Sequence, residues 1–197
     1  MKKKVLIACL AAGLFACSQP EKSDENSAAE VAEQSAVNPF EGLGQEDMLA
    51  KVNEFEGKVF KSDGTMDVTN ANLLIDGYVL FGETFPDAPE SANLLFKAAE
   101  VSLGMNQAPR SLALYQQVYN NYPEFEKRPF SLFLQGFIYE NNLGRLDDAK
   151  VIYEKFLADY PDHPMADDAS YSLVNLGKSP DELIREFEEK NKSKKES

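Results

Sequence analysis

The chain has very few histidine and cysteine residues, the side chains that most often bind transition metals. Its 197 residues include one histidine, His163, and two cysteines, Cys9 and Cys17. A metal site at His163 would need further histidine or cysteine ligands. Neighbouring carboxylates could hold calcium, but their spacing matches no established calcium loop. The sequence also contains no nucleophile motif, phosphate-binding loop or cofactor fingerprint. It therefore predicts a protein that is not an enzyme, that holds no metal or cofactor, and for which no small-molecule substrate can be identified.

Basic residues are scarce relative to acidic ones. The chain has 20 Lys and Arg against 33 Asp and Glu, which gives a formal net charge of −13 and a pI near 4.6. This charge opposes binding to the phosphate backbone of a nucleic acid. We expect no nucleic-acid partner, and the acidic field favours basic segments of a protein partner.

The N-terminal apolar run is too short to span a bilayer as a permanent helix. Lysines at positions 2–4 precede it, as in a signal peptide. The run ends in the letters LFAC at residues 14–17, which resemble the lipobox of bacterial lipoproteins. The resemblance implies that residues 1–16 are removed and that Cys17, diacylated on its sulfur, anchors the chain in a membrane. The alternative is an ordinary secretory signal with a chance cysteine.

Residues 17–45 are expected to form the lipidated cysteine and a disordered tether. Before Phe40 this stretch consists mainly of Ser, Ala, Glu, Gln and Asn, which cannot bury enough apolar surface to offset chain entropy. A marginal helix around Ala28 to Ala36 is the alternative. In either case the segment is a spacer.

From residue 46 onwards the pattern is helical, and it repeats. Apolar and aromatic residues recur at steps of three and four, and each stripe ends in an aromatic residue followed by proline, at Pro86, Pro123 and Pro161. These prolines lie 37 and 38 residues apart. Such a period, closed each time by an amphipathic helix, is typical of a helical solenoid. The first helix of each unit runs into a glycine, which tolerates the positive φ of a helix end; these glycines are Gly104, Gly144 and Gly177.

The repeat resembles the tetratricopeptide repeat. The residues that carry the resemblance best are small, aromatic and proline positions of one unit, namely Gly136, Tyr139, Ala149, Tyr153 and Pro161. The resemblance implies an all-α, tetratricopeptide-like solenoid of about eight antiparallel helices over residues 46–192, followed by a frayed tail at 193–197. Its last helix begins with a capping box at Ser179 to Glu182 and should turn Leu183, Ile184 and Phe187 inward.

A narrower resemblance lies in the connector YPDHPMADDASYSL, residues 160–173. It is similar to a run common in envelope tetratricopeptide proteins of Gram-negative bacteria, such as the lipoprotein of the outer-membrane β-barrel assembly machinery and the periplasmic coordinator linked to Tol–Pal. This resemblance implies a lipid-anchored protein of the outer membrane that faces the periplasm.

One segment is unusually aromatic for a helix of this kind. By resemblance to the family, its second apolar stripe faces the groove that receives partner peptides: Phe130, Phe133, Phe137 and Asn141. The equivalent positions in the preceding unit are Leu95, Ala99 and Ser102. The alternative is that Phe133 and Phe137 are buried between neighbouring units.

These observations favour a non-catalytic, lipid-anchored scaffold or adaptor of the bacterial cell envelope, which binds an envelope protein or peptide segment. One alternative is an accessory subunit of outer-membrane protein assembly. Another is a regulatory subunit of a cell-wall enzyme, whose catalytic residues would belong to the partner.

Overall fold

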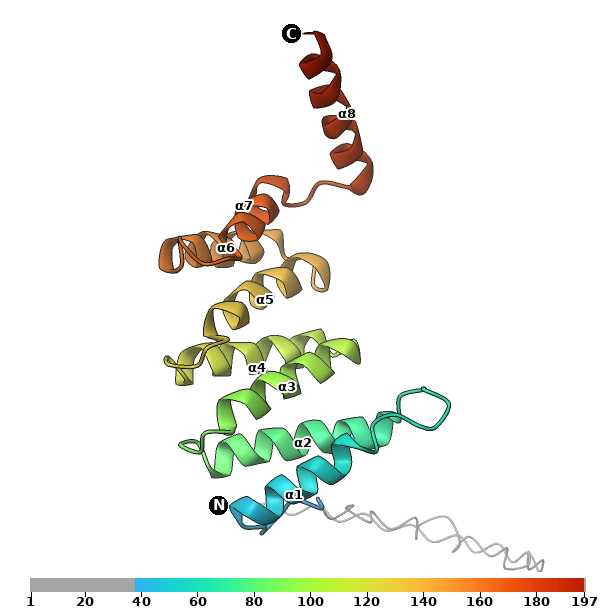
Figure 1. The fold of residues 1–197 in the computed structure, drawn as a ribbon, viewed down its shortest axis with the longest axis vertical. Helices are drawn as coiled ribbons and strands as arrows, with labels where there is room; N and C mark the ends of the chain where they lie inside the picture. The colour runs from blue at the N-terminus through green and yellow to red at the C-terminus, as the bar shows by residue number, and fades with distance from the viewer. Residues whose placement is uncertain (1–37, 197) are drawn as a thin grey trace, which may run out of the picture. The chain divides into compact units, whose positions relative to one another are not determined.

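The computed structural model describes residues 38–196. The predicted signal peptide, the lipid attachment at Cys17 and most of the tether lie outside the described residues. Eight helices make up the described part of the chain (Figure 1). Their bounds are α1 Gln45–Glu56, α2 Val68–Thr84, α3 Ser91–Gly104, α4 Ala108–Asn121, α5 Arg128–Asn141, α6 Leu146–Asp159, α7 Ala166–Asn175 and α8 Pro180–Glu196.

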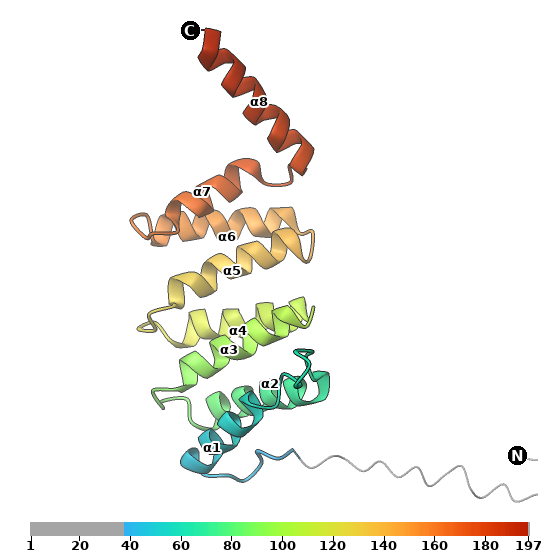
Figure 2. The same cartoon turned by 45° about the vertical axis from the view of Figure 1, so that its right-hand side comes forward.

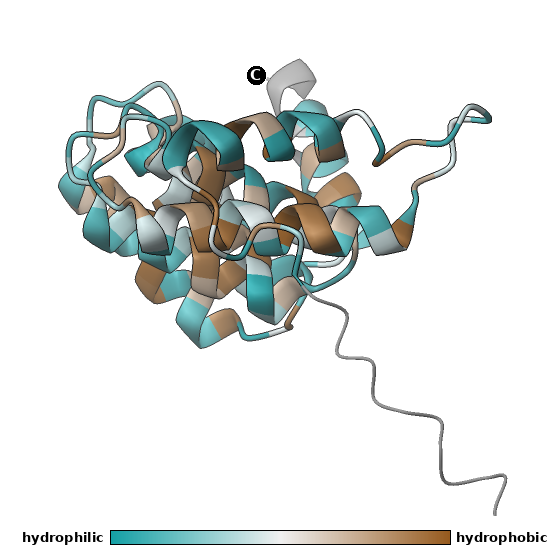
Figure 3. Ribbon diagram, turned by 90° about the horizontal axis from the view of Figure 1, so that it is seen from below, coloured by the Kyte–Doolittle hydropathy of each residue, from teal (hydrophilic) through white to brown (hydrophobic). Residues whose placement is uncertain are grey.

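Helices α1 to α7 stack in chain order, and each packs against the next (Figures 1 and 2). Hydrophobic segments concentrate where the stacked helices overlap, and the loops at the edge are mostly hydrophilic (Figure 3). One buried cluster draws on α1 to α5, and a second joins α4 to α7. The structure thus confirms an all-α helical solenoid.

The aromatic-proline turns end the second helix of each pair as the sequence predicts. Phe85, Tyr122 and Tyr160 are the C-cap residues of α2, α4 and α6. Each donates its backbone N–H to the carbonyl four residues earlier, at 2.8, 3.1 and 2.8 Å. The proline that follows has no N–H to continue this ladder, so the helix stops there.

The three glycines predicted just past helix ends differ in backbone conformation. Gly144 and Gly177 take φ values of +63° and +76°, as expected of glycine just past a helix end. Gly104, however, is the last residue of α3, and Asn106 takes the left-handed conformation in the turn that follows, with φ 58°. Asparagine tolerates this region better than most residues.

The ordered fold begins earlier than the sequence predicts. Phe40, which the sequence predicts to lie in the tether, is fully buried, and its ring centroid lies 5.2 Å from that of Phe55. The ring also fills the space beside Gly77 of α2, where an added β-carbon would lie 2.5 Å from it. Phe40 is therefore a core residue, because the absence of a side chain at Gly77 opens a place for it.

Helix α8 departs from the stack. Among the described helices it packs along none of the others, and it extends away from α7 (Figures 1 and 2). It also continues to Glu196, so residues 193–196, which the sequence predicts to fray, are helical. Within residues 38–196, no helix combines the length and the apolar character needed to cross a bilayer.

Candidate functional site

Helices α5 and α6 approach each other closely at Gly136. A β-carbon added to Gly136 would lie 2.7 Å from the ring of Tyr153, which is fully buried. The hydroxyl of Tyr153 donates to Glu140 Oε2 at 2.8 Å. Burial raises the pKa of Tyr153 well above its ordinary value, and the carboxylate of Glu140 adds to the rise. Tyr153 therefore stays neutral and serves as a packing residue.

A row of aromatic rings crosses from one unit to the next. Phe130 stacks on Phe96 of α3 at 6.0 Å between centroids and on Phe133 at 6.5 Å. Phe133 then meets Phe156 of α6 edge to face at 5.9 Å. Pairs at these separations add to the stability that burial supplies. Phe130 and Phe133 therefore join the two buried clusters.

Phe137 and Asn141 continue the same stripe of α5, one and two turns after Phe133. Phe137 is 40% exposed, whereas Phe133 is 9% exposed. Asn141 is exposed, and its side-chain N–H donates to the carbonyl of Phe137 at 3.0 Å. Of the predicted groove residues on α5, Phe137 and Asn141 are exposed and Phe130 is half-buried, whereas Phe133 follows the alternative of burial between units.

The groove residues predicted on α3 are Leu95, Ala99 and Ser102, and all three are fully buried. Leu95 packs against Gly82 of α2, where an added β-carbon would lie 2.8 Å from its side chain. The carbonyl of Ala99 accepts a hydrogen bond from the Ser111 hydroxyl of α4 at 2.7 Å. This corrects the predicted groove at α3, because α2 and α4 cover the face on which these residues lie.

A polar cluster links α1, α2 and α3. Lys97 Nζ and the hydroxyl of Tyr78 both donate to Glu56 Oε1, at 2.8 and 2.5 Å. Burial raises the pKa of the Glu56 carboxyl, but the bonds from Lys97 and Tyr78 together outweigh it, so the pKa lies below its ordinary value. Glu56 is thus ionised at neutral pH, and the cluster holds neighbouring units in register.

The single histidine has a structural role. Its Nδ1 accepts a hydrogen bond from the backbone N–H of Met165 at 3.2 Å. The ring of His163 meets Phe156 edge to face, with centroids 5.6 Å apart. Among the described residues, no group of three or more His, Cys, Asp or Glu side chains is placed to hold a metal ion.

The most exposed apolar surface lies at α7 and α8, which the sequence did not single out. The prediction that Ile184 and Phe187 turn inward is wrong, because α8 leaves the stack and both are more than half exposed, at 57% and 67%. Tyr171 and Val174 of α7 are also open, at 63% and 68%. The apolar stripe of α8 is the feature of the sequence that could have indicated this surface. The stripe alone, however, does not show whether α7 covers it.

Comparison with known families agrees with this architecture. Residues 94–124 and 130–163 match the model of the tetratricopeptide repeat. These two stretches correspond to α3 with α4 and to α5 with α6. No curated protein matches the chain closely enough to be a relative. Repeats of this family are generally non-catalytic and mediate protein–protein interaction. The two matched segments cover 65 of the 197 residues and lie in a continuous stack of paired helices, so this part of the chain is similar to tetratricopeptide repeats.

Proposed function

We propose that the chain is a non-catalytic, lipid-anchored adaptor of a bacterial cell envelope that binds a protein partner. The observation that carries the adaptor role is the pair of tetratricopeptide repeats over residues 94–124 and 130–163. The described residues offer paired helices and exposed apolar side chains, such as Phe137. Function then depends on surface complementarity.

The envelope location rests on the sequence. The lipobox-like residues 14–17 support lipid attachment at Cys17, and the connector at residues 160–173 supports the outer membrane of a Gram-negative bacterium, with the domain in the periplasm. Replacing Cys17→Ser should abolish labelling by fatty acids and move the protein to the soluble fraction. Labelling that persists in the variant would contradict the anchor.

The partner class is tested by crosslinking in intact envelopes of the native host, followed by purification of the full-length chain. Components of β-barrel assembly would identify an accessory subunit of outer-membrane protein assembly. Peptidoglycan synthases or hydrolases would identify a regulatory subunit of a cell-wall enzyme. The matched control is the Cys17→Ser protein. If the wild-type chain captures no envelope protein above this control, the adaptor role is contradicted.

A further inference from the structure

The last two helices, α7 and α8, do not pack along each other, whereas the helices of each earlier pair do. In α5 and α6, for example, the ring of Tyr153 seals the space above Gly136. At the end of the stack, α7 packs on α6, but α8 does not return along α7 (Figures 1 and 2). A terminal helix of a solenoid normally covers the last apolar face. Here that face remains uncovered.

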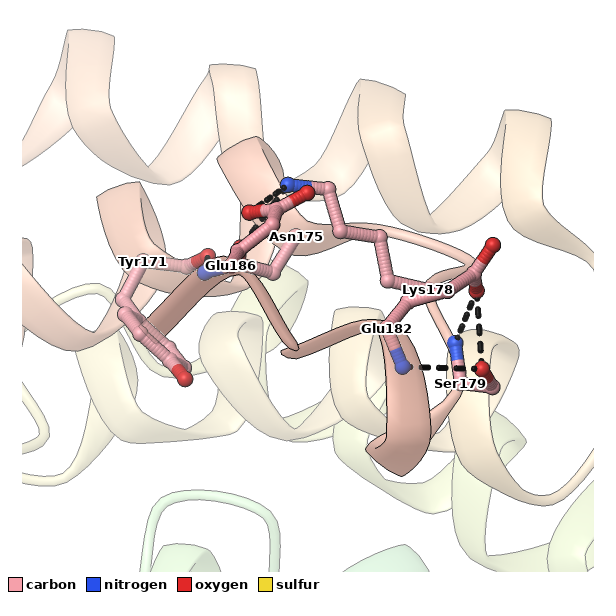
Figure 4. Close-up of polar contacts among 6 residues, drawn as sticks. All are labelled: Tyr171, Asn175, Lys178, Ser179, Glu182 and Glu186. Carbon is pink, nitrogen blue, oxygen red and sulfur yellow. Dashed lines mark hydrogen bonds and ion pairs between the residues drawn. The ribbon is translucent and has the colours of Figure 1, made fainter. Parts of the chain in front are cut away.

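Specific contacts hold α8 in this position. Gly177 has φ +76°, and an added β-carbon there would lie 2.8 Å from Leu146. Lys178 Nζ then bridges the two helices, at 3.2 Å from Asn175 Oδ1 and 2.9 Å from Glu186 Oε2 (Figure 4). The open pair is therefore stabilised by its connector.

A capping box fixes the start of α8. The backbone N–H and the hydroxyl of Ser179 both donate to Glu182 Oε2 at 2.8 Å, and the N–H of Glu182 donates back to the Ser179 hydroxyl at 3.3 Å (Figure 4). This reciprocal arrangement satisfies backbone donors that the first turn leaves free. It sets where the helix begins, and so sets the direction in which its apolar side chains project.

A groove lies between the two helices. Its apolar lining comes from both of them and comprises Tyr171, Val174, Leu183 and Phe187. Asp167 and Glu186 line it as well. Lys178 is the basic residue of this lining. Around the groove, residues 166–189 carry seven acidic residues against two basic ones, and the lysines of α8 follow beyond it, at residues 190, 192, 194 and 195. Lys178 is already paired with Glu186.

We propose that this groove binds an amphipathic helix of a protein partner, with its apolar face on Val174 and Phe187 and with lysine or arginine residues at its edges. The inference rests on the proposed adaptor role and names the surface that serves it. The occupant is a helix because a helix closes each earlier pair in the stack. We expect basic residues at the edges of the partner helix because the residues around the groove are mostly acidic. A second copy of this chain is the other occupant that the test distinguishes, because α8 itself carries lysines at residues 190, 192, 194 and 195.

The test measures binding of two designed peptides to the purified full-length chain by fluorescence anisotropy. One peptide is an amphipathic helix with a leucine face and lysine edges, and the other has glutamate in place of each lysine. The double variant Val174→Ser/Phe187→Ser removes the apolar lining. Because both side chains are exposed, we expect it to remain folded, as circular dichroism would show. Its matched control is Val151→Ser/Phe60→Ser, which removes two equally exposed apolar side chains elsewhere, at 61% and 62%.

We expect the lysine peptide to bind, the glutamate peptide to bind at least about tenfold more weakly, and the groove variant to lose about tenfold or more in affinity for the lysine peptide. The control variant should stay within about twofold. Equal binding of the two peptides, or equal losses in both variants, would overturn the proposal. A dimer seen by sedimentation that the groove variant loses would identify a second copy as the occupant, and would also overturn it.

The same variant separates this inference from the adaptor role. If the groove variant still captures the crosslinked envelope partner as well as wild type does, the adaptor role stands and the groove assignment fails. If wild type captures no partner, the adaptor role itself fails.

Discussion

The ring of Tyr153 occupies the space that a side chain at Gly136 would need. An added β-carbon would lie 2.7 Å from Cε1 of that ring and 2.9 Å from Cδ1. The ring has no free direction in which to move, since Tyr153 is fully buried and contacts Phe133 at 5.7 Å between centroids. Two helices can therefore approach closely only because residue 136 is glycine.

Replacing Gly136→Ala should lower the free energy of unfolding by about 1–2 kcal/mol. Overpacking a filled core costs about 1–3 kcal/mol, and the better helix propensity of alanine returns up to about 1 kcal/mol. Urea denaturation followed by circular dichroism measures the change. The control is Gly104→Ala, where an added β-carbon would meet nothing within 4 Å; its effect should stay within about 0.5 kcal/mol. Equal effects at the two positions would contradict the packing argument.

Phe40 provides a second test, of where the fold begins. Because its side chain is fully buried against Phe55 and Gly77, replacing Phe40→Ala should cost about 3–5 kcal/mol of stability. Phe60→Ala is the matched control, since that ring is 62% exposed and its loss should cost less than about 1 kcal/mol. If Phe40→Ala melts like wild type, the segment before α1 is not part of the cooperative fold.

Much of the fold can be predicted from the sequence because its signals are local. The aromatic-proline turns at Pro86, Pro123 and Pro161 mark the ends of helices through the chemistry of single residues. The small residue Gly136 and the aromatic Tyr153 are positions of one unit that the family resemblance already marks, and the structure brings them into contact. The capping box of α8 likewise lies within four residues, and the structure shows its reciprocal hydrogen bonds.

The candidate site depends on contacts between units, which the pattern of one unit does not specify. Leu95 and Phe137 both occupy apolar helix positions, but Leu95 is covered by α2, whereas Phe137 is 40% exposed. Phe40 follows a polar stretch, and its burial depends on a glycine far along the chain. The direction of α8 depends on a connector around Gly177 and Lys178 rather than on the stripe of α8 itself.

The cluster at Glu56 predicts a dependence of stability on pH. The pKa of this carboxyl is lower in the folded protein than its ordinary value of 4.5. A group of this kind contributes stability that is fully present above its unfolded pKa and is lost as the pH falls through its folded pKa. Between neutral pH and about pH 3.5, wild type should therefore lose more thermal stability than Glu56→Gln, which has no charge to lose. Differential scanning calorimetry at both pH values measures this.

Lys97 supplies the control for the pH experiment. Lys97 Nζ lies 2.8 Å from Glu56 Oε1 and forms the ion pair that favours the charged carboxylate. In a Lys97→Gln background, the difference in acid sensitivity between glutamate and glutamine at residue 56 should shrink. A difference of unchanged size would show that the ion pair is not its cause.

Phe133 and Phe137 have opposite environments, so their single variants should separate packing from binding. Phe133→Ser removes a ring packed against Tyr153 and Phe156 and should cost about 3 kcal/mol or more, because a cavity and a buried hydroxyl replace it. Phe137→Ser removes a ring that is 40% exposed and should cost less than about 1 kcal/mol. Thermal melts measure both. A double variant would unfold through Phe133 alone, so only Phe137→Ser can report whether this face of α5 contacts a partner. If Phe137→Ser is as unstable as Phe133→Ser, Phe137 belongs to the core and offers no binding surface.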